Sequence, residues 1–281
     1  MKKKSNINEL IKSELTYFSP MHERSLASSN DERALWRKET IRERQERISL
    51  EVFQLCKKTV CYGPFKGMKL SEDNWWGKLD LGSQCLGLYE KELLEIISKF
   101  KKNEFTTLID IGAADGYYAV GMLFSGKVQH AICFEQSQKG RETIQRNFEY
   151  NNSPGKINIL EEANIVSLSK ISNYLTNKTF VIIDIEGAEF NLLTDDILNK
   201  LHLCTIFIEI HNWIENFNFL YENLLMRADK YFEINIVDRL ERSTINIEEL
   251  RDFTDDNRLL LTSERRPCMM RFLILKPKKH S

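Results

Sequence analysis

Carboxylates and an imidazole stand at the ends of apolar runs, where side chains with chemical roles are expected. The run TFVIIDIEGAEF at 179–190 places Asp184 after its apolar stretch, followed by Glu186 and Glu189. Three carboxylates this close together are costly unless they are paired, hydrogen-bonded or bound to a cation. Helix capping would account for Glu186 or Glu189 but explains Asp184 poorly. We therefore interpret Asp184 as a functional residue.

A second run, CTIFIEIHN, ends in Glu209 and His211, which lie two apart and so on one side of a strand. If this strand adjoins the one that ends in Asp184, one crevice holds two carboxylates and an imidazole. His211 could take a hydroxyl proton as general base, because its unperturbed pKa is about 6.5. Alternatively, Asp184, Glu209 and His211 could hold a divalent cation that acidifies a hydroxyl. A purely structural histidine is the remaining interpretation.

The stretch TTLIDIGAADGYYAV at 106–120 predicts a strand ending in Asp110, a turn containing Gly112 and Gly116, and a helix start. Glycine allows a sharp bend and lets a ligand approach the backbone, and the helix N-terminus offers free N–H groups. The spacing is G-x-x-x-G and lacks the middle glycine of G-x-G-x-x-G, the one against which a pyrophosphate lies. NAD and FAD are therefore disfavoured, and a ligand with adenosine but no phosphate is favoured.

The cofactor that meets this requirement is S-adenosylmethionine. The next apolar run, QHAICFE, ends in Glu135, roughly 20 residues after Gly112, where a carboxylate commonly holds a ribose diol. A strand-end glutamate facing water is the alternative. A nicotinamide-dependent oxidoreductase and a non-catalytic Rossmann-like binding module are the rival functions.

Strand and helix patterns alternate along the remaining chain, which is typical of a parallel sheet covered on both faces. We predict an α/β, Rossmann-like fold with a seven-stranded, mostly parallel sheet and an antiparallel last strand. The predicted strands are 106–112, 129–135, 156–162, 179–185, 204–210, 231–237 and 269–275. The predicted helices between them are 116–125, 137–150, 164–176, 188–201 and 213–229. Ligands bind such sheets at the carboxyl ends of the strands.

We predict two parts of the chain. Residues 1–84 form an N-terminal helical extension and a β/loop segment, and residues 85–281 form the domain that contains the sheet. A break is predicted near Pro20, and an amphipathic helix over 31–58 with Asp31 as its cap. This helix would pack on the main domain or form a homo-oligomer. Residues 59–82 predict loops or short strands with Trp75 and Trp76 as core anchors or as part of the site's mouth, and 88–101 predicts a helix.

The segment 238–267 is too long for a simple turn and is either a solvated helical insertion or a functional loop. Its last arginines, Arg265 and Arg266, could bind a phosphate or carboxylate of an acceptor, because guanidinium holds such groups bidentately.

The amino-acid composition limits the kinds of partner and the cellular compartment that we expect for this protein. The chain has 281 residues with 42% hydrophobic and 29% charged residues, as in a globular protein, and a formal net charge of −1 offers no general attraction to nucleic acid or anionic membranes. No apolar run is long enough for a membrane span, and the start lacks a secretory signal. Six cysteines without a C-x-x-C pair suggest buried thiols in a reducing compartment, not disulfides or a zinc site. These features predict a cytoplasmic protein.

The motifs DIGAADGYY, FEQ, IIDIEGAEFNLL and IFIEIH, with GLYEKEL upstream, resemble the FkbM family of S-adenosylmethionine-dependent methyltransferases. The resemblance covers roughly residues 85–212 and is most specific at D-I-E-G-A-E followed by E-I-H. It implies a methyltransferase domain that methylates a hydroxyl, often on a sugar or secondary metabolite. Ala114 and Asp115 depart from the family's more usual Asn-containing turn.

The resemblance also implies roles for single residues. Asp110, Gly112 and Gly116 would line the methionine side of the cofactor, Glu135 the ribose, and Glu162 and Ala163 the adenine. The complete predicted cofactor set is Asp110, Gly112, Ala113, Gly116, Glu135, Glu162, Ala163 and Asp184, and the predicted catalytic set is Asp184, Glu209 and His211. We expect the acceptor to be a small polar molecule, a sugar in glycan or natural-product assembly, placed between Asp184, His211 and the C-terminal loops.

Overall fold

The structure is a computed structural model in which residues 7–278 are described, Leu10 and residues 17–30 by their backbone only. Residues 1–6 of the predicted extension and residues 279–281 of the predicted domain lie outside the described residues.

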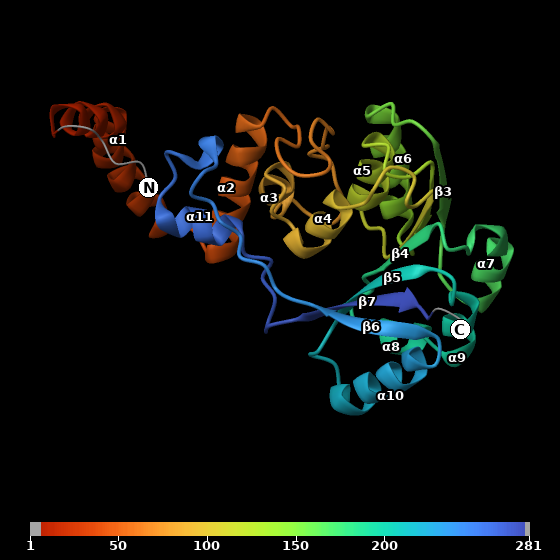
Figure 1. Cartoon of the computed structure of the whole chain (residues 1–281). Coiled ribbons are helices and arrows are strands. Elements are labelled where there is room, and N and C mark those ends of the chain that lie inside the picture. Colours follow the sequence, from red (N-terminus) through yellow and green to blue (C-terminus); the bar gives the residue numbers. More distant parts are fainter. Residues whose placement is uncertain (1–6, 279–281) are drawn as a thin grey trace.

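All seven predicted strands form, and they build one sheet in the order β3-β2-β1-β4-β5-β7-β6 (Figure 1). The strands are β1 (Thr107–Ile111), β2 (His130–Phe134), β3 (Lys156–Leu160), β4 (Thr179–Ile183), β5 (Thr205–Ile210), β6 (Phe232–Val237) and β7 (Arg271–Pro277). Strands β1 to β5 pair in parallel, whereas β7 lies antiparallel between β5 and β6. This is the Rossmann-like methyltransferase fold, as predicted.

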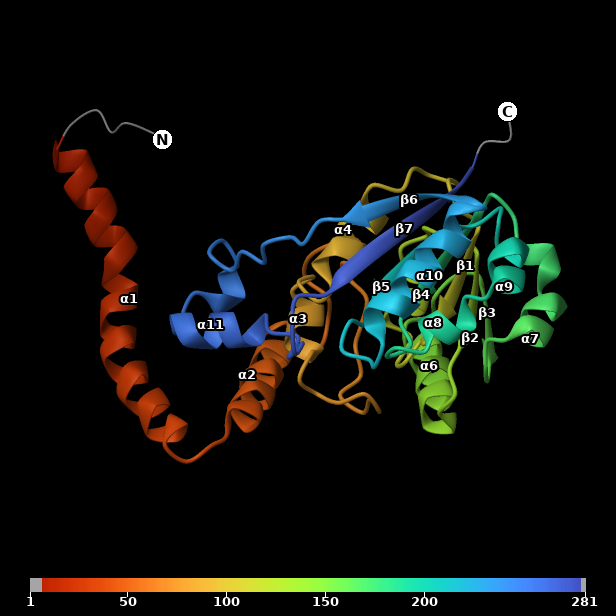
Figure 2. The same cartoon turned by 90° about the horizontal axis from the view of Figure 1, so that it is seen from below.

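Helices cover both faces of the sheet (Figure 2). They are α3 (Leu81–Cys85), α4 (Lys91–Ser98), α5 (Tyr117–Phe124), α6 (Gln138–Tyr150), α7 (Ile165–Lys170), α8 (Glu189–Leu192), α9 (Asp195–Lys200) and α10 (Phe217–Asp229), with the 3₁₀ turn η1 (Ser172–Tyr174). The predicted helix over 188–201 is two helices, because Thr194 caps α9 by accepting the Ile197 N–H.

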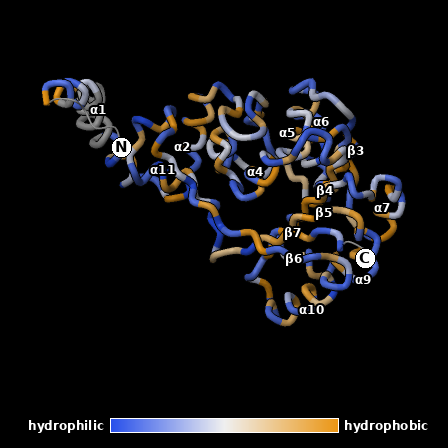
Figure 3. The backbone as a smooth tube through the Cα atoms, in the orientation of Figure 1, coloured by the Kyte–Doolittle hydropathy of each residue, from blue (hydrophilic) through white to orange (hydrophobic). Residues whose placement is uncertain are grey.

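Successive side chains along each strand point to opposite faces of the sheet, so the core forms two layers. In β1, Leu108 belongs to the core cluster that contains residues of α3 to α6, whereas Ile109 and Ile111 belong to the cluster with residues of α7 to α10 on the opposite face. The hydropathy colouring shows the apolar residues gathered in the strands (Figure 3). Because both faces are buried, β1 and β4 carry uninterrupted buried runs, as expected of central parallel strands.

The N-terminal helices differ from the prediction. Helix α1 (Ile7–Trp36) runs through Pro20 and Asp31, so neither the predicted break nor the Asp31 cap is present. Helix α2 (Ile41–Leu55) begins at Thr40, whose hydroxyl accepts the Glu43 N–H while Glu43 accepts the Thr40 N–H. This reciprocal capping box is a stronger helix start than a lone aspartate.

The insertion 238–267 packs on the N-terminal part of the chain. It contains η2 (Glu248–Leu250) and α11 (Asp255–Leu261), and α11 lies beside α2 (Figures 1 and 2). Glu32 at the end of α1 accepts hydrogen bonds from Arg47 of α2 and Asn257 of α11. Apolar residues before and after position 84 share one core cluster, and the boundary between residues 84 and 85 stays a prediction. No helix among the described residues is long and apolar enough to cross a membrane.

Candidate active site

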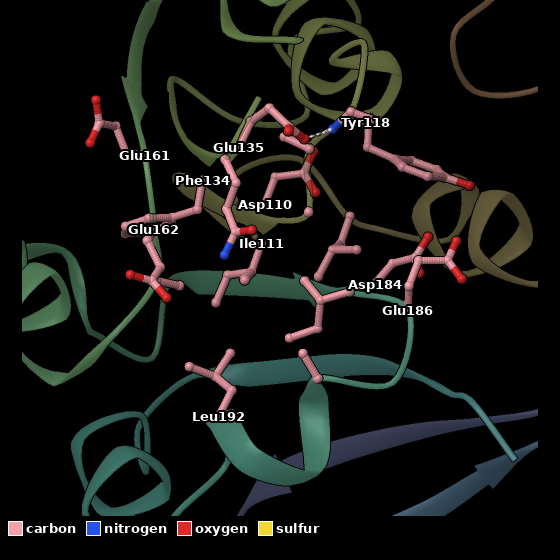
Figure 4. Close-up of a pocket in the computed structure, with 18 of the residues that line it drawn as sticks. Asp110, Ile111, Tyr118, Phe134, Glu135, Glu161, Glu162, Asp184, Glu186 and Leu192 are labelled. Carbon is pink, nitrogen blue, oxygen red and sulfur yellow. Dashed lines mark hydrogen bonds between the residues drawn. The ribbon is translucent and has the colours of Figure 1, made fainter. Parts of the chain in front are cut away.

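A cavity of about 650 Å³ opens at the carboxyl ends of β1 to β4 (Figure 4). Seven of the eight predicted cofactor residues line it, namely Asp110, Gly112, Ala113, Glu135, Glu162, Ala163 and Asp184. Gly116 does not line it; this glycine is the left-handed N-cap of α5 and packs against Ile144. Glu209 and His211, predicted to be catalytic, also lie outside the lining. Three rings that sequence patterns left unassigned to a site, Tyr89, Tyr117 and Tyr118, complete one wall.

Gly112 is needed for a reason that the sequence did not reveal. Its φ is +88°, and a Cβ at this position would overlap the carbonyl oxygen of Asp184 on the neighbouring β4 connection. A side chain here would therefore disturb the pairing of β1 with β4, not only the approach of a ligand. We therefore expect Gly112→Val to disturb the fold as well as cofactor binding.

Glu135 holds the turn after β1 to the turn after β2. Its carboxylate accepts the Ala114 N–H at 3.0 Å and the Ser137 N–H at 2.7 Å. Ala114 adopts a left-handed conformation, with φ +47°, which directs its N–H toward this carboxylate. The Glu135 side chain is thereby fixed at the edge of the cavity, where its remaining lone pairs can meet a ligand.

Asp110 has an unusual environment for a carboxylate. It is 3% exposed, one oxygen interacts with the Ala119 N–H at the start of α5, and Oδ2 has no hydrogen-bond partner. Burial, followed by the charges of Asp184 and Glu135, raises its pKa to about 7. In Figure 4, Asp110 lies next to Glu135 on one side of the cavity, and Asp184 and Glu186 lie on the other. A cationic or hydroxyl-bearing ligand would satisfy this oxygen.

The lining as a whole is acidic and aromatic. Among the described residues that line the cavity, none is Lys or Arg, whereas Asp and Glu recur around it. Trp75 and Trp76 stand at the wall in an edge-to-face pair, and Trp76 is 47% exposed. Asp115 accepts the Trp75 N–H at 3.0 Å and so fixes this wall. The tryptophans thus belong to the mouth of the cavity, and its field favours positive charge.

His211 stands between carboxylates behind the cavity. Its Nδ1 lies 3.1 Å from Glu189 Oε1 and its Nε2 lies 3.4 Å from Asp184 Oδ1. Burial lowers the pKa of His211, but the hydrogen bonds and charges of Asp184 and Glu189 outweigh burial and raise it to about 10. An imidazolium with both nitrogens engaged has no lone pair for a hydroxyl proton. The geometry therefore argues against His211 as general base and favours Asp184, which borders the cavity.

Glu209 points toward Arg266, which is its ion-pair partner. Donor atoms of Glu209, Asp184 and Glu90 lie within 4.8 Å of one another, and those of Asp184, Glu186 and His211 form a separate group of this kind. The predicted Asp184, Glu209 and His211 are therefore not one donor set. Arg266 and His211 already supply positive charge to these carboxylates, so the structure gives no support to a divalent cation here.

Glu90 is a site residue that sequence reasoning missed. It is 3% exposed, lines the cavity and accepts a hydrogen bond from Tyr118 Oη at 2.7 Å. Burial, followed by the charge of Asp184, raises its pKa to about 8. Its place in GLYEKEL, the segment upstream of β1 that carried part of the family resemblance, was the only available signal.

The proposed anion-binding role of Arg265 and Arg266 is not supported. Arg265 forms two hydrogen bonds to Asp80, at 3.0 and 2.7 Å, and Arg266 bonds Glu264 at 2.7 Å. Neither arginine lines the cavity, and no residue of the insertion does. The acceptor is therefore not expected among the C-terminal loops.

No family model matches the chain, and no curated protein is similar to it in sequence. Solved structures with low sequence identity are similar to part of the chain. The precorrin 8w decarboxylase of Methanobacterium thermoautotrophicum is 16% identical over 66% of this chain and 89% of that chain, with a TM-score of 0.42. TYW2 of M. jannaschii in complex with AdoMet is 14% identical over 68% and 75%, with a TM-score of 0.39. TrmK of M. capricolum in complex with S-adenosyl-homocysteine is 17% identical over 69% and 69%, with a TM-score of 0.41.

Proposed function

We propose that this protein is a methyltransferase that moves the methyl group of S-adenosylmethionine to a hydroxyl of a small polar acceptor. The observation that carries the proposal is the Asp110 carboxylate, which lines the acidic cavity beside Glu135 and whose buried Oδ2 has no hydrogen-bond partner. S-Adenosylmethionine carries a sulfonium and an ammonium group together with a ribose diol, and these groups complement such a lining.

In this proposal Asp110 accepts a hydrogen bond from the cationic methionine part of the cofactor, and Glu135 accepts hydrogen bonds from the ribose hydroxyls. Glu162, on the β3 side of the cavity (Figure 4), and the lining residue Ala163 next to it in the chain would border the adenine. A nicotinamide dinucleotide fits less well, because its pyrophosphate would meet carboxylates without a lysine or arginine among the described lining residues. An anionic acceptor, such as RNA or a phosphorylated sugar, is disfavoured on the same ground.

Methyl transfer requires the acceptor oxygen, the methyl carbon and the departing sulfur in line. We assign removal of the hydroxyl proton to Asp184, whose side chain is 31% exposed at the cavity. His211 and Glu209 are then positioning residues behind it. The motif resemblance extends this proposal in two respects: we propose that the acceptor is a sugar and that the protein belongs to the FkbM family.

The test is the formation of S-adenosylhomocysteine from S-adenosylmethionine in the presence of neutral sugars, sugar conjugates and phosphorylated sugars. Turnover with a neutral hydroxyl acceptor that falls at least about 100-fold in Asp184→Asn supports the assignment. Cofactor binding without any turnover, together with unchanged cellular function in Asp184→Ala, would instead support the rival non-catalytic binding module.

A further inference from the structure

Cys56, Cys61 and Cys85 meet next to Glu249, a carboxylate that is distant from them in the sequence, outside the cavity. Cys56 ends α2, Cys61 lies in the following loop and Cys85 ends α3. The Cys56 thiol interacts with the thiols of Cys85 and Cys61, and the Cys61 N–H donates to the Cys85 carbonyl oxygen at 2.7 Å. Glu249 of η2 approaches from the insertion.

The donor atoms are close enough to share one ion. One ligand atom each from Cys56, Cys61 and Glu249 lie within 4.8 Å of one another. Tetrahedral zinc, with Zn–S of about 2.3 Å and Zn–O of about 2.0–2.2 Å, brings its ligand atoms about 3.5 Å apart. Small side-chain movements would close this gap. Glu249 is further oriented by Tyr62 Oη, which donates to its second oxygen at 2.8 Å, as is common for carboxylates that bind metals.

The burial of the four side chains also fits a structural ion. Cys56 and Cys85 are 4% and 0% exposed, whereas Cys61 and Glu249 are partly exposed and leave a path from solvent. We propose that Cys56, Cys61 and Glu249 hold a structural zinc ion and that the Cys85 thiol, which contacts the Cys56 thiol, moves in to complete the tetrahedral ligand set. Thiolate-rich tetrahedral sets of this kind select zinc over harder cations such as magnesium or calcium.

This site would connect α2 and α3, which are near each other in the sequence, to η2 in the distant insertion. Gln84, next to Cys85, lines the cavity and its carbonyl oxygen accepts from Tyr117 Oη at 3.2 Å. The ion would therefore also fix one wall of the cavity. The expectation from the sequence that the cysteines make no zinc site rested on the missing C-x-x-C spacing, which a site assembled from three segments does not need.

The experiment uses the full chain, purified under reducing conditions without a histidine tag, and measures bound zinc by atomic emission. About one zinc per chain is expected, and replacement by Co²⁺ should produce thiolate-to-cobalt charge-transfer absorption. Cys56→Ser and Glu249→Gln should lose zinc, whereas Cys204→Ser, a fully buried cysteine elsewhere in the core, should keep it.

Glu249→Gln keeps the proposal testable if Cys56→Ser does not fold, because Glu249 is partly exposed and its replacement conserves shape. Chelator should lower the Tm of the wild type and leave that of Glu249→Gln unchanged. Wild-type protein with no zinc and no cobalt–thiolate absorption would overturn the proposal. So would a disulfide between any two of these cysteines in the reduced preparation, or equal zinc content in Cys56→Ser and Cys204→Ser.

Discussion

Two sets of buried carboxylates lie at the same sheet edge and differ in what neutralises them. Asp110 and Glu135, the cavity pair, accept only backbone N–H groups, and Asp110 keeps an oxygen without a partner. Glu189 and Glu209 belong to a paired cluster with His211 and Arg266. The difference suggests different roles, because a carboxylate neutralised by a cation of the protein stabilises the fold, whereas a buried carboxylate without one is suited to bind a cationic ligand.

The largest expected effect concerns the paired cluster. His211→Ala should destabilise the protein by about 3–5 kcal/mol, because Glu189, which is 0% exposed, would keep its charge without the imidazolium. Urea unfolding at pH 7 measures this loss. His202→Ala, whose ring bonds only the Asn199 carbonyl, is the matched control and should change stability by less than about 0.5 kcal/mol.

The same pair predicts a pH dependence. Since folding raises the pKa of His211 from 6.5 to about 10, its contribution is complete below about pH 6.5 and is lost as the pH rises through 10. His211→Ala should remove this loss of stability. If wild type and His211→Ala respond equally to alkaline pH, the imidazolium is not the stabilising partner of Glu189.

The next effect concerns Asp110 Oδ2, the oxygen of the cavity pair that has no hydrogen-bond partner. Asp110→Asn should weaken S-adenosylmethionine binding by about 100-fold, or about 2.7 kcal/mol, because a charged acceptor is lost. The unliganded variant should be at least as stable as wild type at pH 8, since burial disfavours the Asp110 carboxylate. Glu222→Gln, an exposed glutamate outside the cavity lining, is the control. A variant that loses stability but keeps its affinity would show Asp110 to be structural.

A smaller effect is expected at Glu135. Glu135→Ala should weaken cofactor binding by about 1.5–3 kcal/mol if its carboxylate accepts from the ribose. Part of this loss would come from the turn, because Ala114 and Ser137 lose their shared acceptor. Glu135→Gln separates the two contributions, and titration with adenosine alone checks them. Unchanged adenosine affinity in both variants would place the ribose elsewhere.

The sequence predicted the sheet well because the central strands are apolar on both faces and therefore form uninterrupted runs. It also located the cavity pair, since strand ends and the glycine turn position Asp110 and Glu135 locally. It did not predict partners that arrive from distant segments, such as Arg266 for Glu209 or Tyr118 for Glu90. Without these partners, the two sets of carboxylates cannot be told apart in the sequence, and the roles of His211 as general base, cation ligand or structural residue stayed open.

The most direct test of the open cavity pair is calorimetric titration of the wild-type protein with S-adenosylmethionine at pH 6 and pH 8. Binding with a Kd below about 1 mM is expected. The cation prefers ionised Asp110, whose pKa is raised to about 7, so affinity should fall up to about tenfold per pH unit below 7, and Asp110→Asn should abolish this dependence. No binding at about 1 mM, or equal affinity at both pH values, would contradict the account.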